Sequence, residues 1–251
     1  MFLKKPETIE LIESHRSIRK FLDRPIEPDV LESILHAARW APTSHNMQAY
    51  SVVIVKNPET KRKLSEVCGD QRYVRECPVF LVVCADFYKL RLASEMHGET
   101  LAVEELENVL VGSVDAALVA QNLLLGSRAY GLGGVMIGGI RNDAQAVGEL
   151  LKLPEYVFPV MGMCLGYPDP DKEPWQKPRM PVQAVFHEET YHTEAVPAAL
   201  TEYDEIMSDY YTRRTDGRRT SGWTEQLAAY ISKPRRKELT EFIKKQGFNL
   251  K

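Results

Sequence analysis

Cysteine is scarce in this 251-residue chain, and its four cysteines form no recognisable motif. Cys68, Cys77, Cys84 and Cys164 show neither a CxxC pair nor the Cys/His spacing of a metal site. Cys84 and Cys164 lie in apolar runs and are expected in the core, whereas Cys68 and Cys77 are expected in more exposed positions. No pattern suggests a disulfide, which favours a reduced, cytoplasmic setting.

Side chains for hydrolytic or metal chemistry are also missing. The sequence contains no HExxH motif, no Ser/His/Asp or Cys/His grouping and no set of metal-binding carboxylates. Among the six histidines, only His15 belongs to a motif. We therefore expect no catalytic side chain and no metal, and a cofactor that carries the chemistry itself.

Membrane and nucleic-acid signals are weak. The first ten residues, MFLKKPETIE, lack the apolar core of a signal peptide, and no stretch is expected to reach the ~20 apolar residues that cross a bilayer. The net charge of −3 argues against a general nucleic-acid binder, so any cationic site must be local. A soluble, cytoplasmic protein is expected.

The spacing of apolar residues predicts an α+β fold in a single domain, 1–251, with a helical C-terminal excursion over about 197–251. The predicted strands are 51–55, 79–84 and 156–165, together with a short strand between two glycine turns in 131–139. The predicted helices are 6–16, 28–39, 58–67, 103–130 and 142–151, with a return to helix over about 197–245. The proline-rich stretch 166–181 is predicted to be an extended arm.

The helix predicted at 103–130 is the longest, and from Leu106 onward it is apolar nearly all round. A helix of this kind is buried on every side. Two interpretations remain open: a helix at a dimer interface, which small residues such as Gly112 and Ala116 would permit, or a central core helix within one subunit.

Two cationic clusters indicate a phosphate-bearing ligand. His15-Arg16-Ser17-Ile18-Arg19 concentrates two guanidiniums, an imidazole and a hydroxyl at the end of the first helix, and Lys177-Pro178-Arg179 adds a second cationic pair. The alternatives are a cationic helix end favoured by the helix dipole and a solvated arm.

A third cluster, Arg213 to Arg219, is predicted to be a mobile basic loop with Gly217 at its tip. Such a loop would recruit a phosphate-bearing partner transiently, or would simply be a solvated face.

Glycines mark one further candidate site. Gly131-Leu132-Gly133-Gly134 leaves a helix and enters a strand, the reverse of a dinucleotide-binding fingerprint, so a Rossmann fold is not expected. Ile137-Gly138-Gly139, at the far end of that strand, would allow a planar ligand to approach the backbone, or would form a plain turn.

Taken in order, the segments HRSIRKF, APTSHNMQ, CGDQRYV, IGGIR, LGYP and KPRMP resemble the nitroreductase/flavin reductase family. The resemblance is strongest to its oxygen-insensitive, NADPH-dependent branch and covers almost the whole chain. It implies a nitroreductase-like α+β fold, with a central, mostly antiparallel sheet flanked by helices around a long buried helix. It also implies an interlocked homodimer with FMN at the subunit interface.

The resemblance assigns the FMN contacts to segments that lie far apart in the sequence. His15 and Ser17 would lie at the phosphate and ribityl end, and Arg19 beside N1 and O2 of the flavin, where a cation stabilises the anionic reduced form. The remaining FMN-binding residues that it implies are Arg16, Gln71, Tyr73, Ile137, Gly138, Gly139, Lys177 and Arg179, with Pro42, Thr43, Ser44 and Asn46 contributed by the second subunit.

The same resemblance places Arg213 and Arg218 at the 2′-phosphate and pyrophosphate of NADPH. Glu107 corresponds to an acidic position near the flavin. Asn46 and Met47 stand where related enzymes often carry an aromatic residue or leucine, so the substrate preference of those enzymes does not transfer.

These residues lead to the hypothesis of an FMN-dependent NADPH oxidoreductase. Hydride from NADPH would pass through flavin N5 to a nitroaromatic, quinone or free flavin acceptor by a ping-pong mechanism, and NADH is a possible second donor. The alternatives are a flavin reductase that supplies reduced FMN to a partner monooxygenase, and a flavin-binding protein with little turnover.

Overall fold

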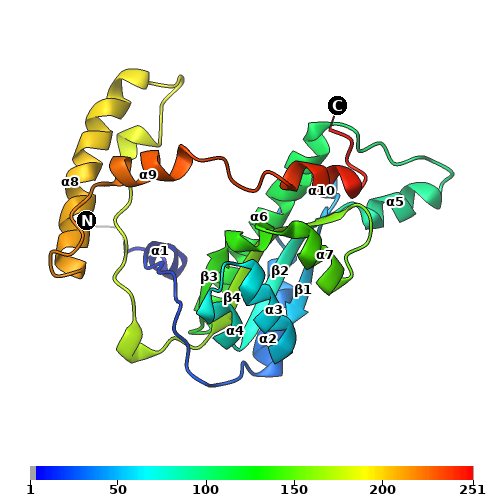
Figure 1. Cartoon of the computed structure of the whole chain (residues 1–251), viewed down its shortest axis with the longest axis horizontal. Coiled ribbons are helices and arrows are strands. Elements are labelled where there is room, and N and C mark those ends of the chain that lie inside the picture. The colour runs from blue at the N-terminus through cyan, green and yellow to red at the C-terminus, as the bar shows by residue number, and fades with distance from the viewer. Residues whose placement is uncertain (1–3, 251) are drawn as a thin grey trace. The chain divides into compact units, whose positions relative to one another are not determined.

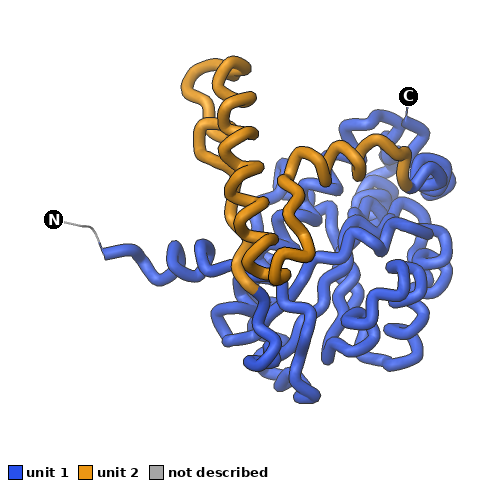
Figure 2. Tube along the Cα trace, turned by 60° about the vertical axis from the view of Figure 1, so that its left-hand side comes forward, with its two compact units in different colours: residues 1–174, 236–251 blue, residues 175–235 orange. Residues whose placement is uncertain are grey.

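The computed structural model describes residues 4–250, and the chain divides into two compact units. Unit 1 comprises Met1–Pro174 and Arg236–Lys251, and unit 2 comprises Trp175–Arg235 (Figure 2). The helical C-terminal part is shared between them, because its last helix belongs to unit 1. A single domain over 1–251 stays a prediction.

Unit 1 is built on a four-stranded sheet in the order β1-β2-β4-β3 (Figure 1). Its strands are β1 (Tyr50–Val55), β2 (Val79–Asp86), β3 (Gly133–Ile137) and β4 (Val157–Gly166). All three neighbouring pairs are antiparallel, in agreement with the predicted sheet. Every residue of β2 is buried, which confirms the fully apolar run as a central strand. β1 and β3 form opposite edges.

Unit 1 also contains helices. They are α1 (Glu7–Glu13), α2 (Pro28–Ala38), α3 (Pro58–Val67), α4 (Arg72–Glu76), α5 (Tyr88–Glu95), α6 (Leu106–Ala129), α7 (Ala144–Leu151) and α10 (Leu239–Lys245), with 3₁₀ turns at Ser44–Asn46, Gly138–Arg141 and Pro170–Lys172. Among them, α6 and α7 pack against the sheet. Proline at the first helical position fixes the start of α2 and α3, and both agree with prediction within one residue. Helices α4 and α5 were not predicted from the sequence.

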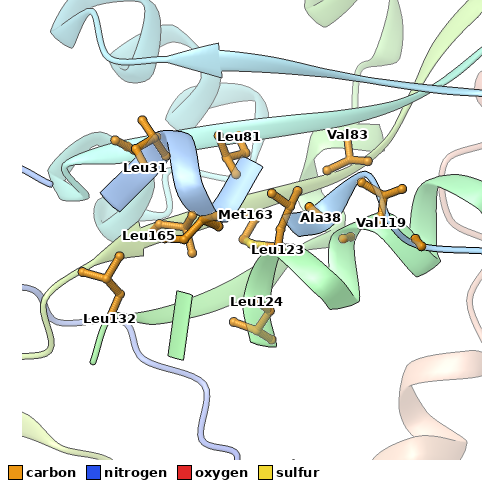
Figure 3. Close-up of a cluster of buried hydrophobic side chains, with 14 of the residues drawn as sticks. Leu31, Ala38, Leu81, Val83, Val119, Leu123, Leu124, Leu132, Met163 and Leu165 are labelled. Atoms are coloured by element: carbon orange, nitrogen blue, oxygen red, sulfur yellow. The ribbon is translucent and has the colours of Figure 1, made fainter. Parts of the chain in front are cut away.

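The main core lies where α6 and α2 pack against one face of the sheet. Figure 3 shows Leu123, Val119 and Leu124 of α6 among Leu81, Met163 and Leu165 from the strands. The opposite side of α6 is open in the single chain: Leu110, Val114 and Leu118 are 52%, 56% and 37% exposed. The expectation of burial on every side is therefore wrong for one subunit.

α6 also corrects the expectation that no segment reaches membrane-spanning length. Among the described residues it is the one helix long and apolar enough to cross a bilayer by length and composition. The core helix of a soluble protein passes the same test, and α6 packs in this way against α2, β2 and β4.

All four cysteines are buried and free. The expectation of more exposed positions for Cys68 and Cys77 is wrong, because their exposed fractions are 1% and 0%. Both belong to a second cluster on the other face of the sheet, with Phe80, Val82 and Val135. Burial raises the pKa of the Cys68 and Cys84 thiols to about 12.

Unit 2 is a helical element with a small aromatic core. It contains α8 (Val196–Arg214), α9 (Trp223–Ile231) and the short 3₁₀ turns Val182–Ala184 and Thr193–Ala195. Tyr203, Met207, Tyr210 and Tyr211 line the buried side of α8. Two of their hydroxyls hold the extended start of the unit: Tyr203 Oη donates to the Pro178 carbonyl at 3.0 Å and Tyr210 Oη to the Trp175 carbonyl at 3.3 Å.

Candidate functional site

The pentapeptide His15 to Arg19 lies outside α1, which ends at Glu13. The Ile18 amide donates to the Gly134 carbonyl at 3.0 Å, and the Leu22 amide to the Tyr167 carbonyl at 2.9 Å. The segment therefore runs along the edge of β3 as an extended strand-like piece. Gly133 permits this approach, because a Cβ there would lie 2.5 Å from Ile18 Cγ1.

Side chains of an extended segment alternate between two faces. Ile18 is buried against the sheet, and Arg16, two residues earlier, forms an ion pair with Glu173 at 2.6 Å. Arg16, Ile18 and Glu173 line one pocket of about 280 Å³, together with Arg128. The alternation places His15, Ser17 and Arg19 on the other face. The structure thus gives Arg16 a protein partner, unlike the flavin contact expected from the sequence.

The other face of the segment is joined to α4 through Arg19. The guanidinium carbon of Arg19 lies 5.9 Å from the centre of the Tyr73 ring, and Nη1 donates to the Ser17 carbonyl at 3.3 Å. The Cys164 thiol of β4 donates to the Tyr73 carbonyl at 3.5 Å, which ties α4 to the sheet. Residues from the segments HRSIRKF and CGDQRYV therefore meet at the β3–β4 side of the sheet.

The turn before α4 packs against the turn after β3. Gly69 and Asp70 both have positive φ, 79° and 53°, which brings Gln71 to the start of α4. A Cβ on Gly139 would lie 2.9 Å from the Cys68 carbonyl oxygen, so this glycine is required for the two turns to touch. The segment IGGIR is thus brought beside CGDQ, as a shared site requires.

Gln71 carries an unpaired polar atom at this place. Its Oε1 is buried and has no hydrogen-bond partner in the described chain. A buried carbonyl oxygen without a donor is unusual in a folded protein, and a ligand donor is one explanation. FMN offers such donors in its ribityl hydroxyls and ring N3–H, so the residues present fit this cofactor.

Two arginine side chains lie near the backbone of Gly138. A Cβ on this residue would lie 3.4 Å from Arg141 Nη2 and 3.6 Å from Arg236 Nη2. Arg236 Nε in turn donates to Asn142 Oδ1 at 3.2 Å. Asn142 and Arg236 were not predicted as site residues, and only the IGGIR segment, which ends at Arg141, indicated a site here.

The loop with Pro42, Thr43, Ser44 and Asn46 lies elsewhere in unit 1. It leads into β1, and β2 and β4 separate that strand from β3. Three inter-strand spacings amount to roughly 14 Å. One chain therefore does not bring this loop to Arg19 and Gln71. Glu107, in the first turn of α6, is exposed.

The remaining predicted cations belong to unit 2. Lys177 and Arg179 are exposed, whereas Pro178 and Met180 between and after them are half-buried against α8.

Arg213 lies in the last turn of α8, so the predicted loop is wrong for this residue. Its Nη1 pairs with Asp209 at 3.2 Å. Arg218 lies in the turn that follows the helix, and its Nε donates to the Thr215 carbonyl at 2.9 Å.

An antiparallel sheet with a cationic segment and a glycine turn at one edge defines an α+β protein suited to a flat, phosphate-bearing cofactor. Comparison with known proteins agrees. The model of the Nitroreductase family matches residues 12–72 and 67–167, and that of the Nitroreductase family, C-terminal domain, matches residues 177–251. The chain belongs to the nitroreductase family.

Relatives match over nearly their whole length. The chain is 39% identical over 242 residues to a Cr(VI) reductase of Pseudomonas sp. (strain G-1), covering 96% of this chain and 99% of the relative. It is 39% identical over 246 residues to the FMN reductase (NADPH) of Bacillus subtilis (strain 168), covering 96% and 98%. The solved structure of NfrA2 from B. megaterium superimposes with a TM-score of 0.96 at 36% identity, covering 98% and 100%.

Proposed function

We propose that this chain is an FMN-dependent NADPH oxidoreductase whose flavin lies at the β3 edge, against Arg19, Gln71 and Gly138. The observation that carries the proposal is the buried, unpaired Oε1 of Gln71 beside a cationic segment. The family and the relatives named as NADPH-dependent reductases support the activity, with FMN as cofactor and NADPH as donor.

Bound FMN supplies the redox chemistry, because it accepts a hydride from the nicotinamide and passes it to an acceptor. The chain's own residues hold and tune the cofactor. Arg19, with its guanidinium near the Tyr73 ring, would offer a positive charge to the pyrimidine side, where negative charge develops on reduction. Gln71 Oε1 would accept a hydrogen bond from the cofactor, and the absence of a side chain at Gly138 would let the ring approach the backbone.

His15 and Ser17 are proposed to bind the phosphate and ribityl end, with Lys177 and Arg179 completing the phosphate contacts. Tyr73, Ile137 and Gly139 support the ring side. Arg16 faces the other way and pairs with Glu173, so its proposed part is to fix the course of the segment. Arg213 and Arg218 are proposed to receive the phosphates of NADPH.

The complete site is proposed to need two subunits. Leu110, Val114 and Leu118 form an exposed apolar stripe on α6, and such stripes mark protein interfaces. The loop at Thr43–Asn46, on the far edge of the sheet, would then complete the site of the second subunit. A homodimer in the cytoplasm, without nucleic-acid or membrane partners, is the proposed state.

The first test is the purified protein itself. We expect a yellow homodimer that retains FMN on gel filtration and oxidises NADPH when an acceptor is present. A colourless protein that takes up no added FMN would rule out the proposal. NADPH and NADH compared by stopped-flow reduction would establish the preferred donor.

A second comparison separates two physiological roles. The FMN reductase among the relatives favours free FMN as the acceptor, in which case reduced FMN would leave for a partner monooxygenase. The Cr(VI) reductase favours an acceptor reduced at the site. Steady-state kcat/KM for free FMN, nitrofurazone and a quinone, measured on one preparation, distinguishes them.

A further inference from the structure

The loop between α2 and β1 is held in a sparsely populated backbone conformation. His45, Asn46 and Gln48 have φ values of 47°, 56° and 51°, and none of them is glycine. Each such residue costs free energy and persists only when the surrounding structure fixes it.

A buried carboxylate in α6 accepts from both ends of the loop. Asp115 is 1% exposed, and its Oδ1 accepts from the Ser44 amide at 3.1 Å while Oδ2 accepts from the Ala49 amide at 3.0 Å. The two amides flank all three residues of positive φ. A carboxylate inside a core is costly unless it is fully hydrogen-bonded, and these two amides meet that need.

α6 lies close enough for this contact because of Gly112, almost one turn before Asp115. A Cβ there would lie 2.9 Å from Ala85 Cβ and 3.6 Å from the Ala49 carbonyl. The approach of the helix and the anchoring of the loop therefore occur at one place.

A lysine on α5 holds the carbonyl side of the same loop. Lys89 Nζ donates to the Tyr50 carbonyl at 2.7 Å and to the Gln48 carbonyl at 3.3 Å. Asp86, which is 5% exposed, lies 3.7 Å from that ammonium and accepts from the Tyr88 amide at 3.0 Å. The anion Asp115 thus binds the loop's amides, and the cation Lys89 binds its carbonyls.

We propose that Asp115 and Lys89 are positioning residues that fix the Thr43–Tyr50 loop in the conformation in which Thr43, Ser44 and Asn46 meet FMN on the second subunit. This inference rests on the proposed function. The exposed stripe Leu110, Val114 and Leu118 lies on the same helix as Asp115, so α6 would set both the subunit contact and the loop.

Asp115→Ala tests the amide side. We expect FMN to bind about tenfold or more weakly, because hydrogen bonds to a charged group are lost at two loop amides. In the apo protein we expect the Ser44 and Ala49 amides to exchange hydrogen faster, and amides of β2 to keep their protection. Val119→Ala is the matched control, since it trims a buried side chain one turn further along α6 and removes no hydrogen bond to the loop.

Lys89→Met keeps the proposal testable if Asp115→Ala fails to fold. The Lys89 side chain is 50% exposed, so this change leaves the core intact. We expect weaker FMN binding and faster exchange at Ser44 and Ala49, with the dimer unchanged in sedimentation. Lys89→Arg, which keeps a donor, should restore most of the affinity.

Unchanged FMN affinity and unchanged loop exchange in Lys89→Met would overturn the role of Lys89, and the same result in Asp115→Ala would overturn that of Asp115. An equal loss of affinity in Val119→Ala would make the effect a general one of α6 packing and would also overturn the inference. Failure of the wild-type protein to bind FMN is a different result, because it removes the proposed function and leaves the exchange measurements of the apo protein to judge the loop anchors.

Discussion

The Arg19 guanidinium carbon lies 5.9 Å from the centre of the Tyr73 ring, although 53 residues (20–72) lie between the two in the sequence. This contact joins the cationic segment along β3 to α4, whose first turn begins beside Gln71. Because Arg19 remains exposed, its charge is available to a ligand at this edge.

Arg19→Ala is expected to weaken FMN binding by about tenfold and to lower the reduction potential of bound FMN, because a cation near the ring stabilises the reduced anion. Fluorescence titration gives the affinity, and dye-coupled reduction gives the potential. Lys20→Ala removes the same charge from the next, exposed residue and should change neither value. An unchanged potential in Arg19→Ala would refute the tuning role.

Gln71→Met is expected to act in opposite directions on stability and binding. Removing the unpaired Oε1 should stabilise the apo protein by about 1 kcal/mol, while FMN loses a hydrogen-bond acceptor. Urea unfolding of apo protein and FMN titration measure the two effects. Gln226→Met is the contrasting control, because its Nε2 already donates to the Ser221 carbonyl at 2.9 Å and its loss should not stabilise. Lower apo stability in Gln71→Met would contradict this prediction.

The two glycines of the β3 turn should respond differently to alanine. Gly139→Ala places a Cβ 2.9 Å from the Cys68 carbonyl and should destabilise the apo protein by about 1–3 kcal/mol. Gly138→Ala meets only the flexible ends of Arg141, at 3.4 Å, and of Arg236, at 3.6 Å, so it should spare apo stability and reduce FMN affinity. Thermal unfolding of both apo variants measures the loss of stability in each. Equal losses of stability would show that the turn has only a structural role.

The lowered pKa of Glu27 leads to a prediction about the stability of the fold in acid. A hydrogen bond from Tyr167 Oη, and then the Arg24 guanidinium at 2.6 Å, lower the pKa of Glu27 from 4.5 to about 2. A lowered native pKa means that this interaction stabilises the fold above about pH 4.5 and is lost as the pH falls toward 2. Carboxyl-carbon NMR should show a midpoint near 2 in wild type and a higher one in Tyr167→Phe. Equal midpoints would contradict the hydrogen bond's role.

Local sequence patterns were sufficient to predict most of the helices and strands. Proline at the first helical position marked α2 and α3, and an unbroken apolar run marked β2, because these signals act between residues close in sequence. The short helices α4 and α5 were not predicted, because one or two turns give too few apolar positions for a periodic pattern. The burial of Cys68 and Cys77 was not predicted for another reason, because it depends on packing against strands distant in sequence.

The sequence by itself determined the longer helices, the central strand and the residue types suited to a phosphate-bearing flavin, since short-range sterics and side-chain chemistry govern these. Only the tertiary structure decided which of those residues share a face. The pairing of Ile18 with Gly134 set Arg16 and Arg19 on different faces of their segment, and the strand order placed β1, which follows the Ser44 loop, at the opposite edge from Ile18. The anchoring of Ser44 and Ala49 by Asp115 likewise depends on how closely α6 packs against the loop, a property that no spacing along the chain encodes.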